Sequence, residues 1–195
     1  MKDRTLFTIP LTMSLLLLPL GCGDIIGPGE SCSGQPANTT VKFEDANLEA
    51  EIRIFGGIGP GDDLTCGLLS GIEAVAVIGD SNIRSLAGIQ NLTSLTYLAI
   101  DFNSITDISP LSEVTSLTQL SLHGNSITDI DALSGLTSLS GLLLENNPNL
   151  SNIQPLLDNP VLGVGDLVGL RSTNVSCSDV AALEAKGVTV ESDCP

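Results

Sequence analysis

The chain has few positive charges. Lys and Arg number 7 in 195 residues against 23 Asp and Glu, which gives a formal net charge of −16. Nucleic-acid binding depends on basic clusters, so this balance excludes it, and it also disfavours adhesion to anionic lipid head groups. Self-repulsion that keeps the protein soluble explains the acidity, although a basic partner or calcium-rich surroundings would be tolerated.

Residues that build cofactor and metal sites are also scarce. His123 is the only histidine, and the sequence has no C-x-x-C pair, no glycine-rich phosphate loop and no oxyanion-type motif. The cysteines therefore do not have the spacing of a metal site. We expect no cofactor, no bound metal and no enzymatic activity.

Between Leu95 and Asn147 the sequence repeats itself at a fixed step of 22 residues. Three runs align without a gap in the pattern L-x-x-L-x-L-x-x-N, starting at Leu95, Leu117 and Leu139. This pattern resembles the leucine-rich repeat, in which each unit is a short strand, a turn and a return segment. The resemblance implies an α/β solenoid, a right-handed curved stack with a parallel β-sheet on its concave face.

The spacing within each run has a physical reason. Leu98 and Ile100 alternate with outward residues, so one face of the strand enters the core. The asparagine follows the strand, where backbone groups leave the sheet, and its inward side chain can hydrogen-bond those groups. We therefore expect a structural ladder of Asn103, Asn125 and Asn147.

Flanking units depart from the pattern but continue the stack. An upstream unit starting at Ile72 has Asp80 in the asparagine place, and the unit that starts at Leu139 has one extra residue after its asparagine. A final strand is expected around Val168, with Thr173 in the asparagine place. We expect residues 72–172 to form four repeats and a terminal half unit.

Distinct ends are expected because a single unit cannot bury its own apolar face. Residues 41–53 read V-x-F-x-D-x-x-L-E-x-x-I-R, and apolar residues at 48, 52 and 55 have the spacing of an amphipathic helix. Asp45 or Asn47 is the expected N-cap. The run resembles the helical N-terminal cap of bacterial internalin-like repeat proteins, which implies a cap over residues 41–71.

The other end has the signals of a mixed cap. A helix is expected to begin at Ser178 or Asp179, to stop at Gly187 and to lead into a short strand. This run looks like the C-terminal cap of the same group. Residues 173–195 are therefore expected to close the stack as an α/β cap.

The first 21 residues have the features of an export signal. Two basic residues, Lys2 and Arg4, precede an apolar stretch over residues 6–20. That stretch is too short for a comfortable membrane span but has the length of a secretory signal. No other stretch is long and apolar enough to cross a bilayer, so residues 1–21 are expected to be a signal peptide.

The signal ends in Leu-Pro-Leu-Gly-Cys, which resembles the bacterial lipobox apart from Pro19 at the usual leucine position. The resemblance implies that Cys22 carries lipid and becomes the mature N-terminus. The alternative is a plain secreted protein cut near Gly21 or Gly23. Residues 22–40, rich in Gly, Pro, Ser and Asn, are expected to form a flexible tether.

The five cysteines agree with lipidation, because five is an odd number and setting Cys22 aside leaves four. Four cysteines in an exported chain indicate two disulfides with three possible connectivities. Two of them lie at each end and none lies in the regular repeats, so we expect local pairing as Cys32–Cys66 and Cys177–Cys194. A loop of such length contributes about 3–4 kcal/mol in the chain-entropy model.

The outward strand positions line the concave face and carry whatever specificity the protein has. Tyr97 and Phe102 lie in one unit and are two of only five aromatic residues in the chain. Aromatic side chains ringed by polar groups suit protein recognition, although scattered exposed apolar residues are normal on any surface. The candidate binding patch comprises Tyr97, Asp101, Phe102, Gln119, His123, Leu143 and Glu145.

Two chemical alternatives remain for the acidic residues of the repeats. His123 lies beside Asp101 and Glu145 of the neighbouring units, and a histidine between two carboxylates could be the general base of a hydrolase. A second acidic set, which comprises Asp107, Asp129 and Asp131, suggests a calcium site. Asp107 and Asp129 recur at one repeat position, however, where a turn carboxylate can accept backbone N–H bonds. We favour structural roles for both groups.

The internalin-like resemblance implies a protein–protein interaction module. We interpret the chain as an exported bacterial lipoprotein that binds a protein or peptide through its concave sheet and is not an enzyme. It would reach the outer membrane or cell surface only through its lipid. The alternatives are a structural envelope protein, associating through its sheet edge or convex side, and the hydrolase.

Replacing Cys22 tests the anchor. In a bacterium that processes lipoproteins, the wild-type chain should partition into detergent and incorporate labelled fatty acid, and Cys22→Ser should lose both properties because the acyl chains have no attachment site. Label retained in the variant would exclude Cys22 as the lipidation site.

Overall fold

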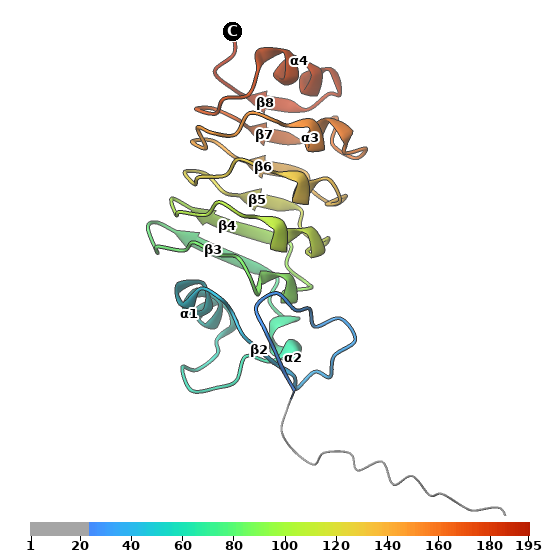
Figure 1. Ribbon diagram of the computed structural model, residues 1–195. Coiled ribbons are helices and arrows are strands. Elements are labelled where there is room, and N and C mark those ends of the chain that lie inside the picture. The colour runs from blue at the N-terminus through green and yellow to red at the C-terminus, as the bar shows by residue number, and fades with distance from the viewer. Residues whose placement is uncertain (1–23) are drawn as a thin grey trace, which may run out of the picture.

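The computed structural model describes residues 24–195, so the expected signal peptide and Cys22 lie outside the described residues. Its main feature is a six-stranded, wholly parallel sheet in which the strands follow one another in chain order (Figure 1). The strands are β3 (Ala74–Ile78), β4 (Tyr97–Asp101), β5 (Gln119–Ser121), β6 (Gly141–Leu143), β7 (Leu167–Gly169) and β8 (Thr189–Glu191). This arrangement confirms the predicted solenoid.

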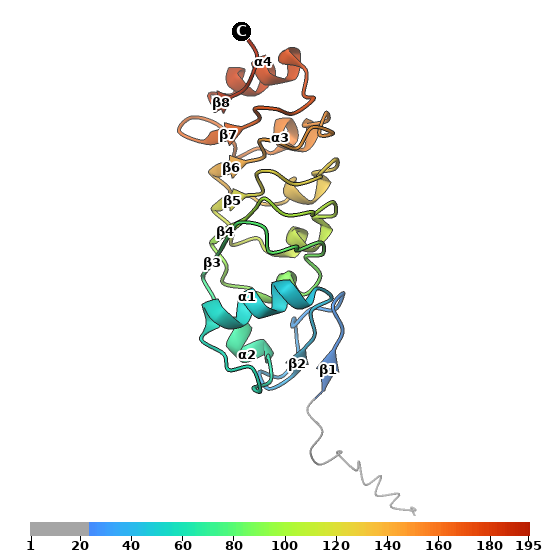
Figure 2. The same ribbon diagram turned by 90° about the vertical axis from the view of Figure 1, so that its left-hand side faces the viewer.

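Each strand returns to the next through a segment on the opposite side of the stack. Figure 2 shows the strands along one side and the short helices along the other. These helices are η1 (Ile89–Asn91), η2 (Ser109–Glu113), η3 (Asp131–Leu133) and α3 (Gln154–Asp158). The stack therefore has a sheet face and a helix face, and the sheet face presents the outward strand residues to solvent.

The core is one continuous column of aliphatic side chains between these two faces. In the unit of β5, Leu117, Leu122, Ile127 and Leu133 have no exposed surface. Their equivalents one unit away are similarly buried, so each unit covers the apolar side of its neighbour. No helix within residues 24–195 is long and apolar enough to cross a bilayer.

The asparagine after each central strand bonds to two units at once. Asn125 donates from Nδ2 to the carbonyl of Leu122 in its own unit at 3.0 Å and to that of Ile100 in the preceding unit at 2.9 Å. Its Oδ1 accepts the backbone N–H of Ile105 at 3.1 Å. All of these partners are backbone groups at the turn, where the sheet ladder no longer pairs them.

Asn103 and Asn147 repeat this arrangement one unit to either side. Asn147 accepts from the N–H of Ile127 at 2.9 Å, and Asn103 accepts from that of Ile83 at 2.9 Å. In the last unit Thr173 stands in this place and donates only to the carbonyl of Leu170. The side-chain ladder thus ends where the C-terminal cap begins.

The N-terminal cap is built around α1 (Ala46–Gly56), whose N-cap is Asp45 rather than Asn47. The Asp45 carboxylate accepts from the N–H groups of Asn47 and Leu48, and it also accepts from Arg84 and Ser85 of the first repeat. Burial raises the pKa of Asp45, but these N–H bonds together lower it further, so the pKa lies below its ordinary value. One side chain therefore caps the helix and joins it to the stack.

The apolar face of α1 differs from the prediction at one position. Leu48 and Ile52 are fully buried, but Phe55 is 41% exposed. The helix ends at a left-handed Gly57, after which the N–H of Ile58 returns to the carbonyl of Arg53 at 2.8 Å. Ile58 packs against the core after this turn, so Phe55 is not needed there.

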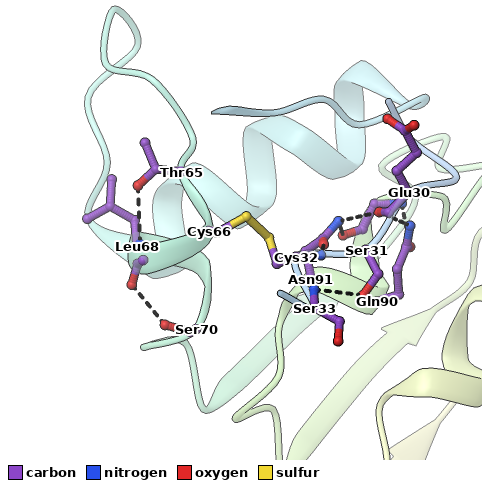
Figure 3. The surroundings of a disulfide bond; sticks show 12 residues. Glu30, Ser31, Cys32, Ser33, Thr65, Cys66, Leu68, Ser70, Gln90 and Asn91 are labelled. Atoms are coloured by element: carbon purple, nitrogen blue, oxygen red, sulfur yellow. Dashed lines mark hydrogen bonds between the residues drawn. A yellow bond between two sulfur atoms is a disulfide. The ribbon is translucent and has the colours of Figure 1, made fainter. Parts of the chain in front are cut away.

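Residues 24–40 do not form the flexible tether that their composition suggested. Strand β1 (Ile25–Ile26) pairs in parallel with β2 (Thr40–Val41), and Cys32 is bonded to Cys66 at the start of α2 (Cys66–Leu69). The buried side chains of Gln90 and Asn91 in η1 bind the backbone of this segment (Figure 3).

Those two side chains satisfy several backbone groups of the segment. Gln90 Nε2 donates to the carbonyls of Pro28 and Glu30, at 2.6 Å and 3.0 Å. Asn91 Oδ1 accepts from the N–H of Cys32 at 2.7 Å. Because the partners come from about 60 residues further along the chain, local composition cannot distinguish this ordered loop from a tether.

The C-terminal cap consists of α4 (Cys177–Ala185) and β8, which joins the main sheet beside β7. The N-cap is Ser176, whose Oγ accepts from the N–H of Asp179 at 3.2 Å, two residues before the nearer predicted cap. The second disulfide, Cys177–Cys194, ties the start of α4 to the chain after β8. Both disulfides are those that the sequence predicts.

Lys186 fastens this cap to the preceding unit. Its Nζ donates to the carbonyls of Leu156, Leu157 and Asn159, at 3.0 Å, 2.8 Å and 2.6 Å. These carbonyls lie in and just after α3, where a helix leaves its last acceptors unpaired. Nothing in the spacing of Lys186 identifies this role from the sequence.

The ladder predicts that Asn125 is structural. Asn125→Ala would leave buried turn groups without partners and should lower the free energy of unfolding by about 1–3 kcal/mol. Urea unfolding measures the change, with Asn174→Ala as the control because Asn174 is exposed. An unchanged midpoint for Asn125→Ala would refute the role.

Candidate functional site

The seven residues of the candidate patch form two adjoining groups on the sheet face. Tyr97, Gln119 and Leu143 line a pocket over the middle strands. The other four residues lie at or just beyond the strand ends, and we call them the His123 cluster. They are Asp101, Phe102, His123 and Glu145.

The pocket has a volume of about 240 Å³ and lies across β4 to β7. Its remaining lining residues are Leu120, Ser121, Ser140, Gly141, Gly165 and Leu167. Tyr97 is 41% exposed, and the Gln119 side chain lies over Gly141, where a Cβ would come 3.3 Å from its Cδ. Small residues in the outward positions thus leave a hollow between larger ones.

One edge of the pocket is formed by an insertion that the sequence analysis did not identify. Buried Leu162 and Val168 are six residues apart, whereas Leu139 and Leu142 at the corresponding places are three apart. The three extra residues are 163–165, and the loop before β7 projects beyond the strands in Figure 2. The signal for it was present, because this unit is longer than 22 residues.

Hydrogen bonds hold the inserted turn in shape. The N–H of Gly163 donates to the Asp166 carboxylate at 2.8 Å, and the N–H of Asp166 donates to the carbonyl of Gly163 at 3.2 Å. Val164 at its tip is 92% exposed, and Gly165 lines the pocket. The turn therefore brings Gly165 to the edge of the pocket, whereas the Val164 side chain lies beside Gly187, where an added Cβ would come 2.6 Å from its Cγ2.

Phe102 occupies a position where the backbone is left-handed, with a φ of 55°. The equivalent residue one unit later is Gly124, and a Cβ there would come 2.8 Å from the Phe102 ring. Bulky residues rarely adopt positive φ, and Phe102 is nevertheless 54% exposed. The fold gains little burial in return for this backbone strain.

His123 packs against Phe102, with ring centroids 4.7 Å apart. Its Nε2 lies 2.8 Å from Nδ2 of Asn146, and its Nδ1 lies 3.8 Å from Oε2 of Glu145. An amide NH₂ can only donate, so in this orientation Nε2 accepts and the neutral ring carries its proton on Nδ1. That proton faces Glu145 from beyond hydrogen-bond distance.

Asp101 is engaged elsewhere. Its Oδ1 accepts from Ser121 Oγ at 2.6 Å and from the backbone N–H of His123 at 3.0 Å. His123 therefore approaches one carboxylate and is not held between two, and no hydrogen bond in residues 24–195 joins Ser121 Oγ to the imidazole. The geometry lacks the nucleophile–base contact that the hydrolase alternative needs.

Glu145 differs from Asp101 because its carboxylate approaches only His123 Nδ1, at 3.8 Å, among the groups paired with it in residues 24–195. Its side chain is only 13% exposed, Oε2 is buried, and neither oxygen accepts a hydrogen bond from residues 24–195. The carboxylate lies over Gly169, where an added Cβ would overlap Oε1. Burial of a charged group without donors is unfavourable, so Glu145 has unused acceptor capacity.

Two of the three acidic residues considered for calcium, Asp107 and Asp129, cap turns. Asp107 Oδ1 accepts from the N–H of Ser109 at 2.8 Å, and Asp129 Oδ1 accepts from that of Asp131 at 2.8 Å. Over the part of the chain that the structure describes, no three His, Cys, Asp or Glu side chains are grouped to hold a metal ion. Repeated turn capping explains the recurrence of these aspartates.

Comparison with known proteins gives the same architecture. A family model described as leucine rich repeat matches residues 93–148. An internalin (inlF) from Listeria monocytogenes is 28% identical with a TM-score of 0.59, over 78% of this chain and 52% of that one. Internalin C2 (inlC2) from the same organism is 21% identical with a TM-score of 0.50, over 76% and 93% of the two chains.

The chain thus spans about half the length of the inlF structure. No curated protein sequence matches it. The fold is an internalin-like leucine-rich repeat solenoid.

The close approach of Glu145 to Gly169 gives a test of the site geometry. Gly169→Ala should push the carboxylate away from His123, and the imidazole NMR resonances, unambiguous for a single histidine, should move. Stability should change by no more than about 0.5 kcal/mol, because a flexible side chain can swing into solvent. Gly135→Ala is the control, since nothing lies within 4 Å of its Cβ. Unmoved resonances in Gly169→Ala would contradict the geometry.

Proposed function

We propose that the protein is an exported, lipid-anchored binding module whose sheet face holds a protein or peptide partner. The observation that carries the proposal is the pairing of exposed aromatic residues with a pocket on one open face. Tyr97 is 41% exposed and lines the pocket, and Phe102 is 54% exposed beside it in the same unit. Interface hot spots are rich in such aromatics surrounded by polar groups.

The strain at Phe102 supports the same proposal. A glycine would adopt its left-handed backbone at lower cost, as Gly124 does in the next unit. Asn146 and Ser172 share this left-handed backbone in the later units, so the repeat imposes it, and what is unusual is a bulky side chain held there. Residues held in such conformations are concentrated at functional sites. The side chain of Phe102 therefore has a use outside the core.

Export is supported from both ends of the chain. Disulfides persist in oxidising compartments, and this protein has one in each cap. The lipid at Cys22 rests on the sequence alone, and it would hold the protein at the outer membrane or cell surface; without it the protein would be secreted. The resemblance to internalin-like repeat proteins implies a protein–protein interaction module, and this favours a binding role at that surface.

Truncation of the two aromatics tests the binding face. Partners that the wild-type chain captures by cross-linking from native envelope and medium should not be captured by the double variant Tyr97→Ala, Phe102→Ala. Each hot-spot aromatic contributes about 2 kcal/mol, roughly thirty-fold in affinity, and calorimetry on the purified pair would measure it. Phe55→Ala is a matched control, because Phe55 is also 41% exposed but lies on α1.

Two results would point elsewhere. Binding that survives the double variant and fails with Phe55→Ala would move the site to the N-terminal cap. Sedimentation that finds stable oligomers of the wild type without any captured partner would favour a structural envelope protein.

A further inference from the structure

Glu145 stands apart from the other acidic residues of the sheet face. Asp101 accepts two hydrogen bonds, and Glu191 pairs with Arg171 at 3.1 Å. The Glu145 carboxylate accepts none from residues 24–195 although its side chain is only 13% exposed. Its ion-pair partner in residues 24–195 is His123, whose Nδ1 lies 3.8 Å from Oε2, too far for a hydrogen bond.

We infer that the partner places a Lys or Arg side chain on Glu145 and an apolar side chain in the neighbouring pocket. This inference rests on the proposed function and names the chemistry of its ligand. A cationic donor would satisfy a carboxylate that accepts no hydrogen bond from residues 24–195, and charge-assisted hydrogen bonds are the strongest of their kind. The formal net charge of −16 also attracts basic partners at long range.

The spacing of the two subsites sets the pattern of the ligand. Leu143 lines the pocket and Glu145 follows it by two residues, with buried Leu144 between them pointing inward. Alternate side chains of an extended chain lie about 7 Å apart on one face. An extended peptide lying along β6 would therefore present an apolar residue and a basic residue separated by one position.

The surroundings of Glu145 are shaped to receive such a group. Gly169 leaves room for the carboxylate to lie against the sheet, and the Phe102–His123 pair stands on its other side. A guanidinium or ammonium group placed there would have an anion and aromatic faces within reach. Tyr97 and Leu167 contribute apolar surface to the neighbouring pocket.

A random peptide library displayed on phage, selected on the purified full chain, tests the pattern. We expect enrichment of sequences with Lys or Arg two positions from an apolar residue. A synthetic peptide of the enriched sequence should bind roughly tenfold more weakly when its basic residue is replaced by Gln. Its affinity for the wild type should also fall as salt is raised.

The matched protein variants are Glu145→Gln and Glu113→Gln. The first removes the charge at the site, and since a nearly buried carboxylate without donors is unfavourable in the free protein, its loss should not lower the melting temperature. We expect it to weaken the selected peptide roughly tenfold and to flatten the salt dependence. Glu113 is exposed in η2 on the helix face, so its variant should bind as the wild type does.

Three results would overturn the inference: no enriched sequence, enrichment without a basic residue, or equal binding to the wild type and Glu145→Gln. A natural partner that depends on Tyr97 and Phe102 but ignores Glu145→Gln would leave the proposed function standing and remove this inference alone. A partner that ignores all three changes would remove both.

Discussion

The central units of this protein depend on their neighbours for the hydrogen bonds of their own turns. The amide of Asn125 bonds to carbonyls of two successive units and to the N–H of Ile105, all of them buried. Apolar burial alone would allow neighbouring units to slide against each other, because aliphatic contacts have no direction. The amide bonds do have direction, and together with the backbone hydrogen bonds of the parallel sheet they fix the register in which Tyr97, Gln119 and Gly141 lie side by side.

This dependence on neighbours makes the two ends the weak points of the stack, and each end is closed by a different means. At the N-terminus Asp45 binds the first repeat, and Gln90 and Asn91 bind residues 24–40 in return. At the C-terminus the sheet simply continues into β8, and Lys186 joins the cap to α3 through three carbonyls. The side-chain ladder does not extend into either cap. A disulfide within each cap stabilises it instead, by limiting the conformational freedom of the unfolded chain.

Features set by the repeat could be predicted from the sequence, and features set by distant contacts could not. Equal spacing determines the strands, the core face and the outward positions, because side chains alternate along a strand and a shift of one residue would move all of them to the other face. The order of residues 24–40 depends on side chains about 60 residues away, and the exposure of Phe55 depends on how Ile58 packs after the helix. At the site, the sequence predicts that His123 lies beside Asp101 and Glu145. Side-chain rotamers and backbone hydrogen bonds, which the sequence does not give, determine that Asp101 accepts from Ser121 and that Glu145 accepts no hydrogen bond from residues 24–195.

The separation between ladder and sheet face explains how the outward residues of this fold can vary without a change in its backbone. The inward column sets the backbone, so outward residues can vary from glycine to phenylalanine at one repeat position, as Gly124 and Phe102 do. Those outward choices are unfavourable for the isolated protein. Phe102 holds a left-handed backbone while half exposed, and Glu145 keeps a carboxylate nearly buried without a donor. Both features lower the stability of the free protein, and both would become favourable when a partner supplies apolar surface to one and a cation to the other.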